Sequence, residues 1–494
     1  MTATGGQLSA RSYHWDHAHI RHGITPHYLD FEHYPLPAKS YLPAEIIPLE
    51  THDNQTGDTP ASFAHLLSHA YGVTRVRRGQ IPFYYRTVPS AGGLYPCHLY
   101  LSITAAADNA ETGVYYYEPV RSGLVQLRQE KTGQNNPLQQ LFAGERELAD
   151  VRLLFIVTAA FYNSAWKYRA RAYRYMLLDT GHLVRNITLN PLIRAFACNT
   201  AFDFDDGKVS DLLNLNSAAE VPLACVSVNW DKSVPDIVAQ TVNHTRPCFP
   251  PVDDRSTEAA YLQDYPELRA IHSAGIPAAG QVPVPETAVT DDRPETVFSV
   301  VSESTRSLDE VPGPDLAGCM IRRRSRRNFI TSPVTAGAYL QLFACLSPGR
   351  NLRDLVRDTG LRVGLVCRKL EGIDDGFYLF DRQVAVLHLM HRGNLAPMLA
   401  SVCLDQAWIG QAAMNFLFFS DLAALDTARG PRGYREMMVA AGMLAQQIYL
   451  GAESLAMGCC GIGAMYDREA ADLLGLSSHV ALVYAVSAGP VKRR

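Results

Sequence analysis

The feature that most constrains the fold of this chain is a stretch that occurs twice. Residues 171–215 and 432–476 align without a gap, and equivalent positions such as Arg174 and Arg435 stand 261 residues apart. Positions of the first copy that keep the same residue type in the second include Arg171, Tyr173, Arg174, Gly181, Leu183, Ile187, Leu189, Cys198, Asp206, Asp211, Leu212, Leu213 and Leu215. Two copies indicate a duplicated domain, since a solenoid needs at least three repeats. A length of 494 residues also suits two domains.

Each copy is expected to form a long helix, a loop and a short helix, because apolar residues recur at helical spacing. The loops differ between the copies. The second copy has glycines at 458, 461 and 463, where the first copy has none. Glycine lets a backbone adopt positive φ or approach a flat ligand closely. We therefore predict a ligand loop in the second copy, and we interpret its vicinal Cys459 and Cys460 as buried small residues rather than a redox pair.

Composition argues against several classes of function. A net charge of −4 and an isoelectric point near 6.5 do not indicate the basic surface that binds nucleic acid. The ten cysteines form no CxxC pair, which is typical of a reducing compartment rather than of a disulfide framework. The N-terminus lacks the apolar stretch of a signal peptide, and no apolar run is long enough to span a membrane, so we expect a cytoplasmic protein. His14, His17, His19 and His22 lie close together, but no Cys or Glu completes a familiar spacing, and no metal is expected.

A turn-rich loop at 86–97 is the first candidate for a functional site. It contains Pro89, Ser90, Ala91 and Gly92 directly before an alternating strand expected at 98–104. A plain β-turn is the alternative interpretation. Two prolines and two glycines so close together favour a rigid ligand loop with accessible backbone N–H groups.

Two further segments occur in one half only. A basic run made of Arg322, Arg323, Arg324, Ser325 and Arg326 suits a phosphate, although a solvated basic turn is the alternative. Lys167 and Tyr168 precede the first long helix, whereas the second copy has Ala428 and Arg429 at these positions.

We expect three parts in the chain. Residues 1–245 form the first half, 246–314 form a Pro-rich linker with one short helix near 261–274, and 315–494 form the second half. Apolar or alternating runs predict equivalent strands in the two halves, at 113–118 and 376–381 and at 152–160 and 415–420.

Taken together, the segments RRRSRRNF, PSAGGLYP and GCCGIG in two related halves resemble the nitroreductase superfamily of FMN enzymes. Within it, the stretches GVYYYE and WKYRARAYRYMLLDTGHLVRNITL resemble the SagB/ThcOx-type dehydrogenases, which oxidise thiazoline and oxazoline rings in ribosomal peptides. The resemblance implies an α+β fold, in which a nitroreductase-like domain is duplicated in tandem and forms an intramolecular pseudo-dimer.

The resemblance also implies one FMN site shared between the halves, because members of this superfamily bind FMN at a dimer interface. The second half would hold the phosphate, with Arg322, Arg323, Arg324, Ser325, Arg326, Gly461, Ile462, Gly463 and Arg493. The first half would contact the ring, with Pro89, Ser90, Ala91 and Gly92. Lys167 and Tyr168 resemble the catalytic pair of the azoline dehydrogenases, and a second flavin site would have decayed.

The function implied is oxidation of azoline-type rings to azoles in peptide or natural-product biosynthesis, with dioxygen as electron acceptor. The substrate would be a peptide or small molecule, presented with or without a partner biosynthetic enzyme or carrier protein. Two alternatives stay open within flavin chemistry: an oxidase of another amino-acid-derived, carrier-bound or cyclic dipeptide substrate, and an NAD(P)H-dependent nitroreductase. A non-catalytic scaffold is the third alternative, and it would lack flavin.

Overall fold

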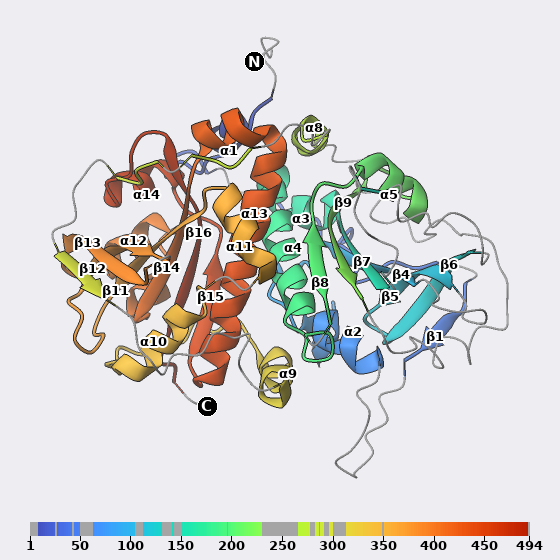
Figure 1. Cartoon of the computed structure of the whole chain (residues 1–494), viewed down its shortest axis with the longest axis horizontal. Helices are drawn as coiled ribbons and strands as arrows, with labels where there is room; N and C mark the ends of the chain where they lie inside the picture. Colours follow the sequence, from blue (N-terminus) through green and yellow to red (C-terminus); the bar gives the residue numbers. More distant parts are fainter. Residues whose placement is uncertain are drawn as a thin grey trace. The chain divides into compact units, whose positions relative to one another are not determined.

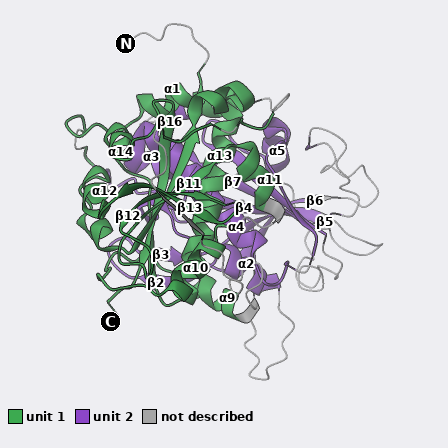
Figure 2. Cartoon of the chain, turned by 60° about the vertical axis from the view of Figure 1, so that its left-hand side comes forward, with its two compact units in different colours: residues 1–28, 270–494 green, residues 29–269 purple. Residues whose placement is uncertain are grey.

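The chain is divided into two compact units, which the computed structural model shows in Figure 2. Unit 1 comprises Met1–Tyr28 and Ala270–Arg494, and unit 2 comprises Leu29–Arg269. The structure describes residues 8–24, 27–41, 44–49, 63–103, 112–130, 141–142, 151, 153–194, 196–229, 265–276, 282–285, 287–290, 296–299, 313–347, 350–382 and 384–492.

Unit 2 is built on a seven-stranded sheet whose described pairings are all antiparallel (Figure 1). In spatial order its strands are β1 (Ile46–Pro48), β6 (Gly123–Glu130), β5 (Thr112–Glu118), β4 (Cys97–Ile103), β7 (Leu153–Ala160), β9 (Glu220–Val228) and β8 (Cys198–Ala201). All eight residues of β7 are buried, which explains why this strand is a nearly continuous apolar run. A separate hairpin pairs β2 (Val73–Arg77) with β3 (Phe83–Arg86).

Unit 1 repeats this sheet. Its strands in spatial order are β10 (Thr296–Ser299), β13 (Val386–Arg392), β12 (Gly376–Asp381), β11 (Arg362–Cys367), β14 (Met414–Asp421), β16 (Val480–Gly489) and β15 (Gly458–Ile462). The described pairings are again antiparallel. The expected strands at 113–118, 152–160, 376–381 and 415–420 correspond to β5, β7, β12 and β14.

The two sheets share irregularities as well as strand order. The pairing of β7 with β9 shifts register between Val157 and Thr158, and that of β14 with β16 shifts between Phe418 and Phe419. These bulges lie 261 residues apart, which is the offset of the sequence repeat. Because bulges are specific features of a strand pair rather than defects, the coincidence confirms the tandem duplication.

A long helix follows the central strand in each unit. In unit 2 this helix is α4 (Ala172–Thr188), and all 17 of its residues are buried. In unit 1 it is α13 (Leu422–Ser454), which is interrupted at Gly430, where φ is 60°, just before Pro431. The other helices of unit 2 are α2 (Phe63–Tyr71), α3 (Phe161–Tyr168) and α5 (Asp206–Leu213); those of unit 1 are α1 (Ala10–Asp16), α9 (Gly313–Arg322), α10 (Ala336–Ala344), α11 (Arg350–Asp358), α12 (Ala396–Val402) and α14 (Asp467–Leu473).

Three expectations differ from the structure. The stretch Gly458–Ile462 is the edge strand β15 rather than a loop, because it pairs with β16 from Gly458↔Gly489 to Ile462↔Ala485. The segment expected to be a linker contains an ordered strand, β10, which closes the far edge of the same sheet. The short helix expected near 261–274 is present as α8 (Pro266–Ala274).

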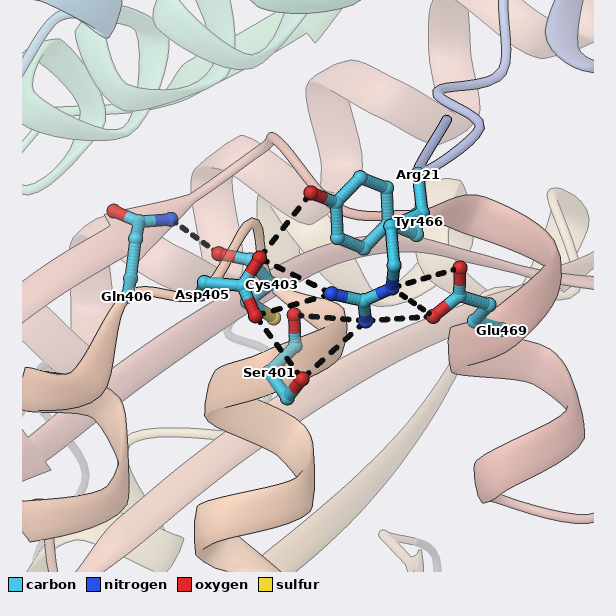
Figure 3. A network of polar contacts seen from close by, with 7 residues as sticks. All are labelled: Arg21, Ser401, Cys403, Asp405, Gln406, Tyr466 and Glu469. Atoms are coloured by element: carbon cyan, nitrogen blue, oxygen red, sulfur yellow. Dashed lines mark hydrogen bonds and ion pairs between the residues drawn. The ribbon is translucent and has the colours of Figure 1, made fainter. Parts of the chain in front are cut away.

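The third difference concerns the N-terminal segment, which we expected in the first half. Residues 8–24 belong to unit 1, where Arg21 donates hydrogen bonds to Glu469 at 2.7 Å and to Asp405 at 3.1 Å (Figure 3). The guanidinium of Arg21 also lies 4.2 Å from the ring centroid of Tyr466. A guanidinium that donates to two carboxylates at once is held in both its orientation and its distance from them. These contacts therefore anchor the N-terminal segment to the second half.

Candidate functional site

The Pro-Ser loop of unit 2 connects β3 to β4 through the short 3₁₀ turn η1 (Ala91–Gly93). Ser90 is extended, and its Oγ accepts a hydrogen bond from the backbone N–H of Tyr95 at 2.8 Å. Gly92 has φ of +63°, a conformation that side chains rarely adopt. The loop is therefore a fixed turn, as its prolines and glycines predict.

A buried carboxylate anchors this loop. Asp179 of α4 accepts a hydrogen bond from Ser90 Oγ at 2.5 Å and another from the backbone N–H of Ala91 at 3.2 Å. Burial raises the pKa of Asp179 to about 7, against the opposing effect of these two hydrogen bonds. The central helix thus holds the loop by an acid that titrates near neutral pH.

Lys167 and Tyr168 pack directly against the same loop. They are the last two residues of α3, and both are partly buried. A Cβ placed on Gly92 would lie 2.9 Å from the Tyr168 hydroxyl and 3.3 Å from Cδ of Lys167. The absence of a side chain at Gly92 therefore lets the Lys-Tyr pair approach the loop, and the structure brings these two sequence candidates together.

The end of α3 holds the pair in place. Trp166 donates its indole N–H to the carbonyl of Asp30 at 2.6 Å. The Tyr168 ring lies 4.3 Å from that of Tyr175, measured between centroids. Arg169 then takes a φ of +49°, which ends α3 and starts the turn into α4. A strained residue at this point is consistent with a functional constraint.

The basic turn of unit 1 pairs with the glycine-rich strand. Arg326 donates its backbone N–H to the carbonyl of Cys459 at 2.9 Å, and Ser325 forms an isolated parallel β-bridge with Cys459. Tyr449 of α13 joins the two segments, because its hydroxyl hydrogen-bonds Ser325 Oγ at 3.0 Å and accepts the N–H of Gly461 at 2.7 Å. The second pair of sequence candidates is therefore also brought together, in the other unit.

Most arginines of this turn are accessible. Arg322, Ser325 and Arg326 are exposed and Arg324 is partly buried, whereas Arg323 is buried, with its guanidinium 5.5 Å from the Tyr449 ring centroid. Among the described residues, no acidic side chain pairs with Arg326, and Glu453 approaches Arg322 at 3.7 Å. The exposed guanidinium groups suit an oxyanion.

Packing within unit 1 leaves no room for side chains at the glycines of β15. A Cβ on Gly461 would lie 2.0 Å from the Tyr484 hydroxyl, and one on Gly458 would lie 2.2 Å from Cγ1 of Val491. Their missing side chains are thus required by packing within unit 1. Ile462 is buried and Gly463 is partly buried beside them, while Arg493 lies outside the described residues.

The vicinal cysteines beside this turn are buried thiols. Burial raises the pKa of both Cys459 and Cys460. Because the thiolate is the reactive form, the interpretation of these residues as buried small side chains is confirmed.

The histidines near the N-terminus are used in packing. His14 is fully buried, and its Nδ1 lies 3.1 Å from the Tyr434 hydroxyl. Within the part of the chain that the structure describes, no group of three His, Cys, Asp or Glu side chains could hold a metal ion. Over the same residues, no helix is long and apolar enough to cross a bilayer.

Asp179 is the site residue that sequence reasoning missed. The signal was present, because Asp179 is the one acidic residue between Ala172 and Thr188. A carboxylate inside a fully buried helix needs a specific partner, and that partner is the Pro-Ser loop.

Replacing Asp179 with Asn is expected to change how stability depends on pH. The folded-state pKa of about 7 lies above the ordinary pKa of 3.8 for an aspartate side chain, so the parent loses stability as pH rises from about 4 to 7. The Asn side chain does not titrate, so it contributes no such pH dependence. Each unit by which folding shifts a pKa changes the free energy of unfolding by roughly 1.4 kcal/mol. The free energy of unfolding of the parent should therefore fall by a few kcal/mol, on the order of 4 at most, relative to the variant over this range.

Urea titrations at pH 4, 5.5 and 7 measure this difference. Asp211→Asn, which removes an exposed carboxylate of α5, is the matched control and should follow the parent. A constant difference between the parent and Asp179→Asn across the range would contradict the assignment.

Comparison with known proteins agrees with this architecture. A sequence model described as "Nitroreductase family" matches residues 58–230 and 370–489, one segment in each half. The crystal structure of a nitroreductase-like protein from Anabaena variabilis is similar over 98% of this chain and 99% of that chain, with 25% identity and a TM-score of 0.78.

Two curated proteins are similar to parts of the chain. A nitroreductase-like protein from Methanocaldococcus jannaschii is 28% identical over 173 residues, which is 34% of this chain and 80% of that protein. The Microcin B17-processing protein McbC from Escherichia coli is 28% identical over 142 residues, which is 28% of this chain and 52% of that protein.

Proposed function

The chain belongs to the nitroreductase family, and on this basis we propose that it is an FMN-dependent dehydrogenase that oxidises azoline-type rings in a peptide or natural product. The family supports an oxidoreductase. The similarity to a microcin-processing protein supports a biosynthetic role. The observation that carries the proposal is the packing of Lys167 and Tyr168 against Gly92 of the Pro-Ser loop.

The residues present fit FMN. Its phosphate needs forked cationic donors, and Arg322, Arg324 and Arg326 supply them at a turn held by Ser325 and Tyr449. Its ring needs a rigid, flat-sided loop, and the anchored turn Ser90–Gly92 supplies one. Among the described residues, the phosphate candidates belong to unit 1 and the ring candidates to unit 2, so we propose that the chain holds one complete set of FMN residues.

The proposed reaction removes a hydride and a proton from an azoline ring. When bound, FMN supplies the acceptor for the hydride, and dioxygen takes the electron pair afterwards. This chain's own residues must take the proton from carbon, and Lys167 or Tyr168 does so in this proposal. Asp179 positions the loop beside them through Ser90 and Ala91, so it acts as a positioning residue.

An anaerobic reduction assay tests the proposal. A thiazoline-containing peptide should bleach the flavin absorbance of the purified protein, and the product should be two mass units lighter because the reaction removes a hydride and a proton. NADPH should bleach it far more slowly. Rapid bleaching by NADPH with none by azoline substrates would instead support a nitroreductase activity, and a colourless protein would contradict both.

A further inference from the structure

A second candidate site lies inside unit 1, where a cavity of about 530 Å³ is lined by the ends of four neighbouring strands, by α11 and by Val284, Pro285, Thr287 and Val289. Strands β12 and β14 end here, and β11 and β16 begin here. The basic turn contacts the opposite end of β16, near Gly489. Ten residues of extended strand separate the two ends, or roughly 30 Å. The cavity is thus distinct from the proposed phosphate site.

The cavity is cationic. Arg353, Arg357, Arg362 and Arg382 line it, together with two acids, Asp381 and Asp421. Asp421 is already engaged, because its Oδ1 caps α13 and its Oδ2 lies 3.5 Å from His479 Nε2. Arg357 is likewise engaged, by Asp354 and Asp358. Arg362 donates its Nη1 to the carbonyl of Thr287 at 3.2 Å, and Arg353 and Arg382 are the other two arginines of the lining.

Two polar atoms of the lining are buried without a hydrogen-bond partner. Arg382 donates its Nη2 to the carbonyl of Leu361 at 2.8 Å, but its Nη1 is buried and has no partner among the described residues. Ser420, which is 1% exposed, has an equally unpartnered Oγ. Burial and the neighbouring Arg362 lower the pKa of Arg382 to about 10. A buried donor left unsatisfied is costly, so these groups indicate a missing acceptor.

The duplicated half shows which acceptor belongs in such a place. The register pairs Asp421 with Val480 in unit 1 and Ala160 with Glu220 in unit 2, so Val480 and Glu220 are equivalent positions. In unit 2 the buried carboxylate of Glu220 forms an ion pair with Lys39 and accepts hydrogen bonds from Tyr100 and Thr158. Burial raises the pKa of Glu220, but Lys39 and His98 outweigh that effect and bring it below the ordinary value.

Unit 1 has arginines at this end of the sheet, but its carboxylate, Asp421, stands opposite Val480 rather than at the position equivalent to Glu220, and it caps α13. Arg362 occupies the position of His98, because the two residues face Phe419 and Thr158 at equivalent points of the central strands. Val480 replaces the acid and lines the cavity. Phe380 and Phe419 add an apolar wall.

We propose that this cavity binds a small organic carboxylate, whose oxygens accept hydrogen bonds from Arg382, Arg362 and Ser420 and whose apolar part packs against Phe380 and Phe419. The guanidinium fork matches the geometry of a carboxylate. This site is additional to the flavin site, and it does not depend on the proposed oxidation.

Calorimetric titration of the flavin-loaded protein with benzoate tests the proposal, with benzamide as the neutral probe of the same shape. Charge-assisted hydrogen bonds predict that benzamide binds at least about tenfold more weakly, and that Arg382→Gln lowers benzoate affinity by about tenfold or more. Ser420→Ala should lower it severalfold. Arg392→Gln is the matched control, since Arg392 forms an ion pair with Asp374 and is not among the residues that line the cavity, and it should bind benzoate like the parent.

A second measurement does not depend on the probe. Val480→Glu places a carboxylate at the position that Glu220 occupies in unit 2, whereas Val480→Gln places a neutral group of the same size there. The Glu variant should melt at a higher temperature than the Gln variant at pH 7 and should no longer bind benzoate.

Three results would overturn the proposal. Benzoate binding unchanged by both Arg382→Gln and Ser420→Ala would place the binding elsewhere. Inorganic phosphate that binds with the same Arg382 dependence, while benzoate does not bind, would exclude a carboxylate. A Val480→Glu protein that melts below Val480→Gln would show that the cavity rejects a carboxylate.

Discussion

Replacing Lys167 with Ala, or Tyr168 with Phe, is expected to leave flavin bound and to slow its reduction by an azoline substrate by about 10²–10⁴-fold. The reason is that a positioned general base contributes a factor of this size to proton transfer from carbon. Both side chains lie against Gly92, within the loop proposed to contact the flavin ring. Anaerobic stopped-flow measurement of flavin bleaching by a thiazoline-containing peptide gives the rate.

Controls separate loss of the base from loss of the fold. Dithionite reduction and reoxidation by air need no substrate base, so both should match the parent. Lys208→Ala, at an exposed position of α5, and Tyr84→Phe, on β3, remove the same groups elsewhere in unit 2 and should leave bleaching unchanged. If both Lys167→Ala and Tyr168→Phe bleach at the parental rate, the two side chains do not act in catalysis and have only a packing role.

The double variant Arg322→Ala with Arg324→Ala is expected to fold but to lose most of its flavin. Each charge-assisted hydrogen bond to a phosphate is worth about 1.5–3 kcal/mol, so together they predict roughly 10²–10⁴-fold weaker FMN binding. Arg322 is exposed, and Arg324 Nη1 donates to the backbone carbonyls of Ile321 and Arg323, so neither side chain is needed for the core.

Flavin content after gel filtration, and FMN titration monitored by fluorescence, measure the effect. Arg353→Ala with Arg357→Ala removes the same charge from α11 of the same unit and should keep parental flavin content. If the Arg322 and Arg324 variant also keeps it, the phosphate binds elsewhere.

Most of the fold was predictable from the repeat. Ungapped identity over 171–215 and 432–476 requires the same local structure in both halves, and the matching strand orders and bulges confirm it. The family was predicted from the segments PSAGGLYP, GCCGIG and RRRSRRNF, and the family model that matches residues 58–230 and 370–489 confirms it. The wrong assignments were short elements whose structure depends on distant partners. The sequence of β15 resembles a glycine loop, because its glycines are explained only by the close packing of Tyr484 and Val491. Strand β10 was missed because it is short and lies within a Pro-rich segment.

The candidate site was predictable as separate segments but not as an assembly. Sequence showed the Pro-Ser loop, the Lys-Tyr pair and the basic turn. It did not show that the missing side chain of Gly92 lets the Tyr168 hydroxyl pack against the loop. It also did not show that Asp179, on a helix distant in sequence, accepts a hydrogen bond from Ser90. Contacts between residues so far apart follow from how α4 packs on the sheet, which local patterns do not encode. The N-terminal segment is a similar case, because the carboxylates that hold Arg21 come from α14 and from the turn after α12.

The central claim is that the chain holds one set of FMN-binding residues and therefore binds one flavin, and flavin stoichiometry tests it most directly. Each half keeps only part of the residues proposed for FMN, so only one complete set exists per chain. Acid extraction of the purified protein, with FMN identified by mass and quantified against amino-acid analysis, should give close to one FMN per chain. A value near two per chain would show that both halves bind flavin independently, and a value near zero after reconstitution with excess FMN would show that the chain holds no flavin site.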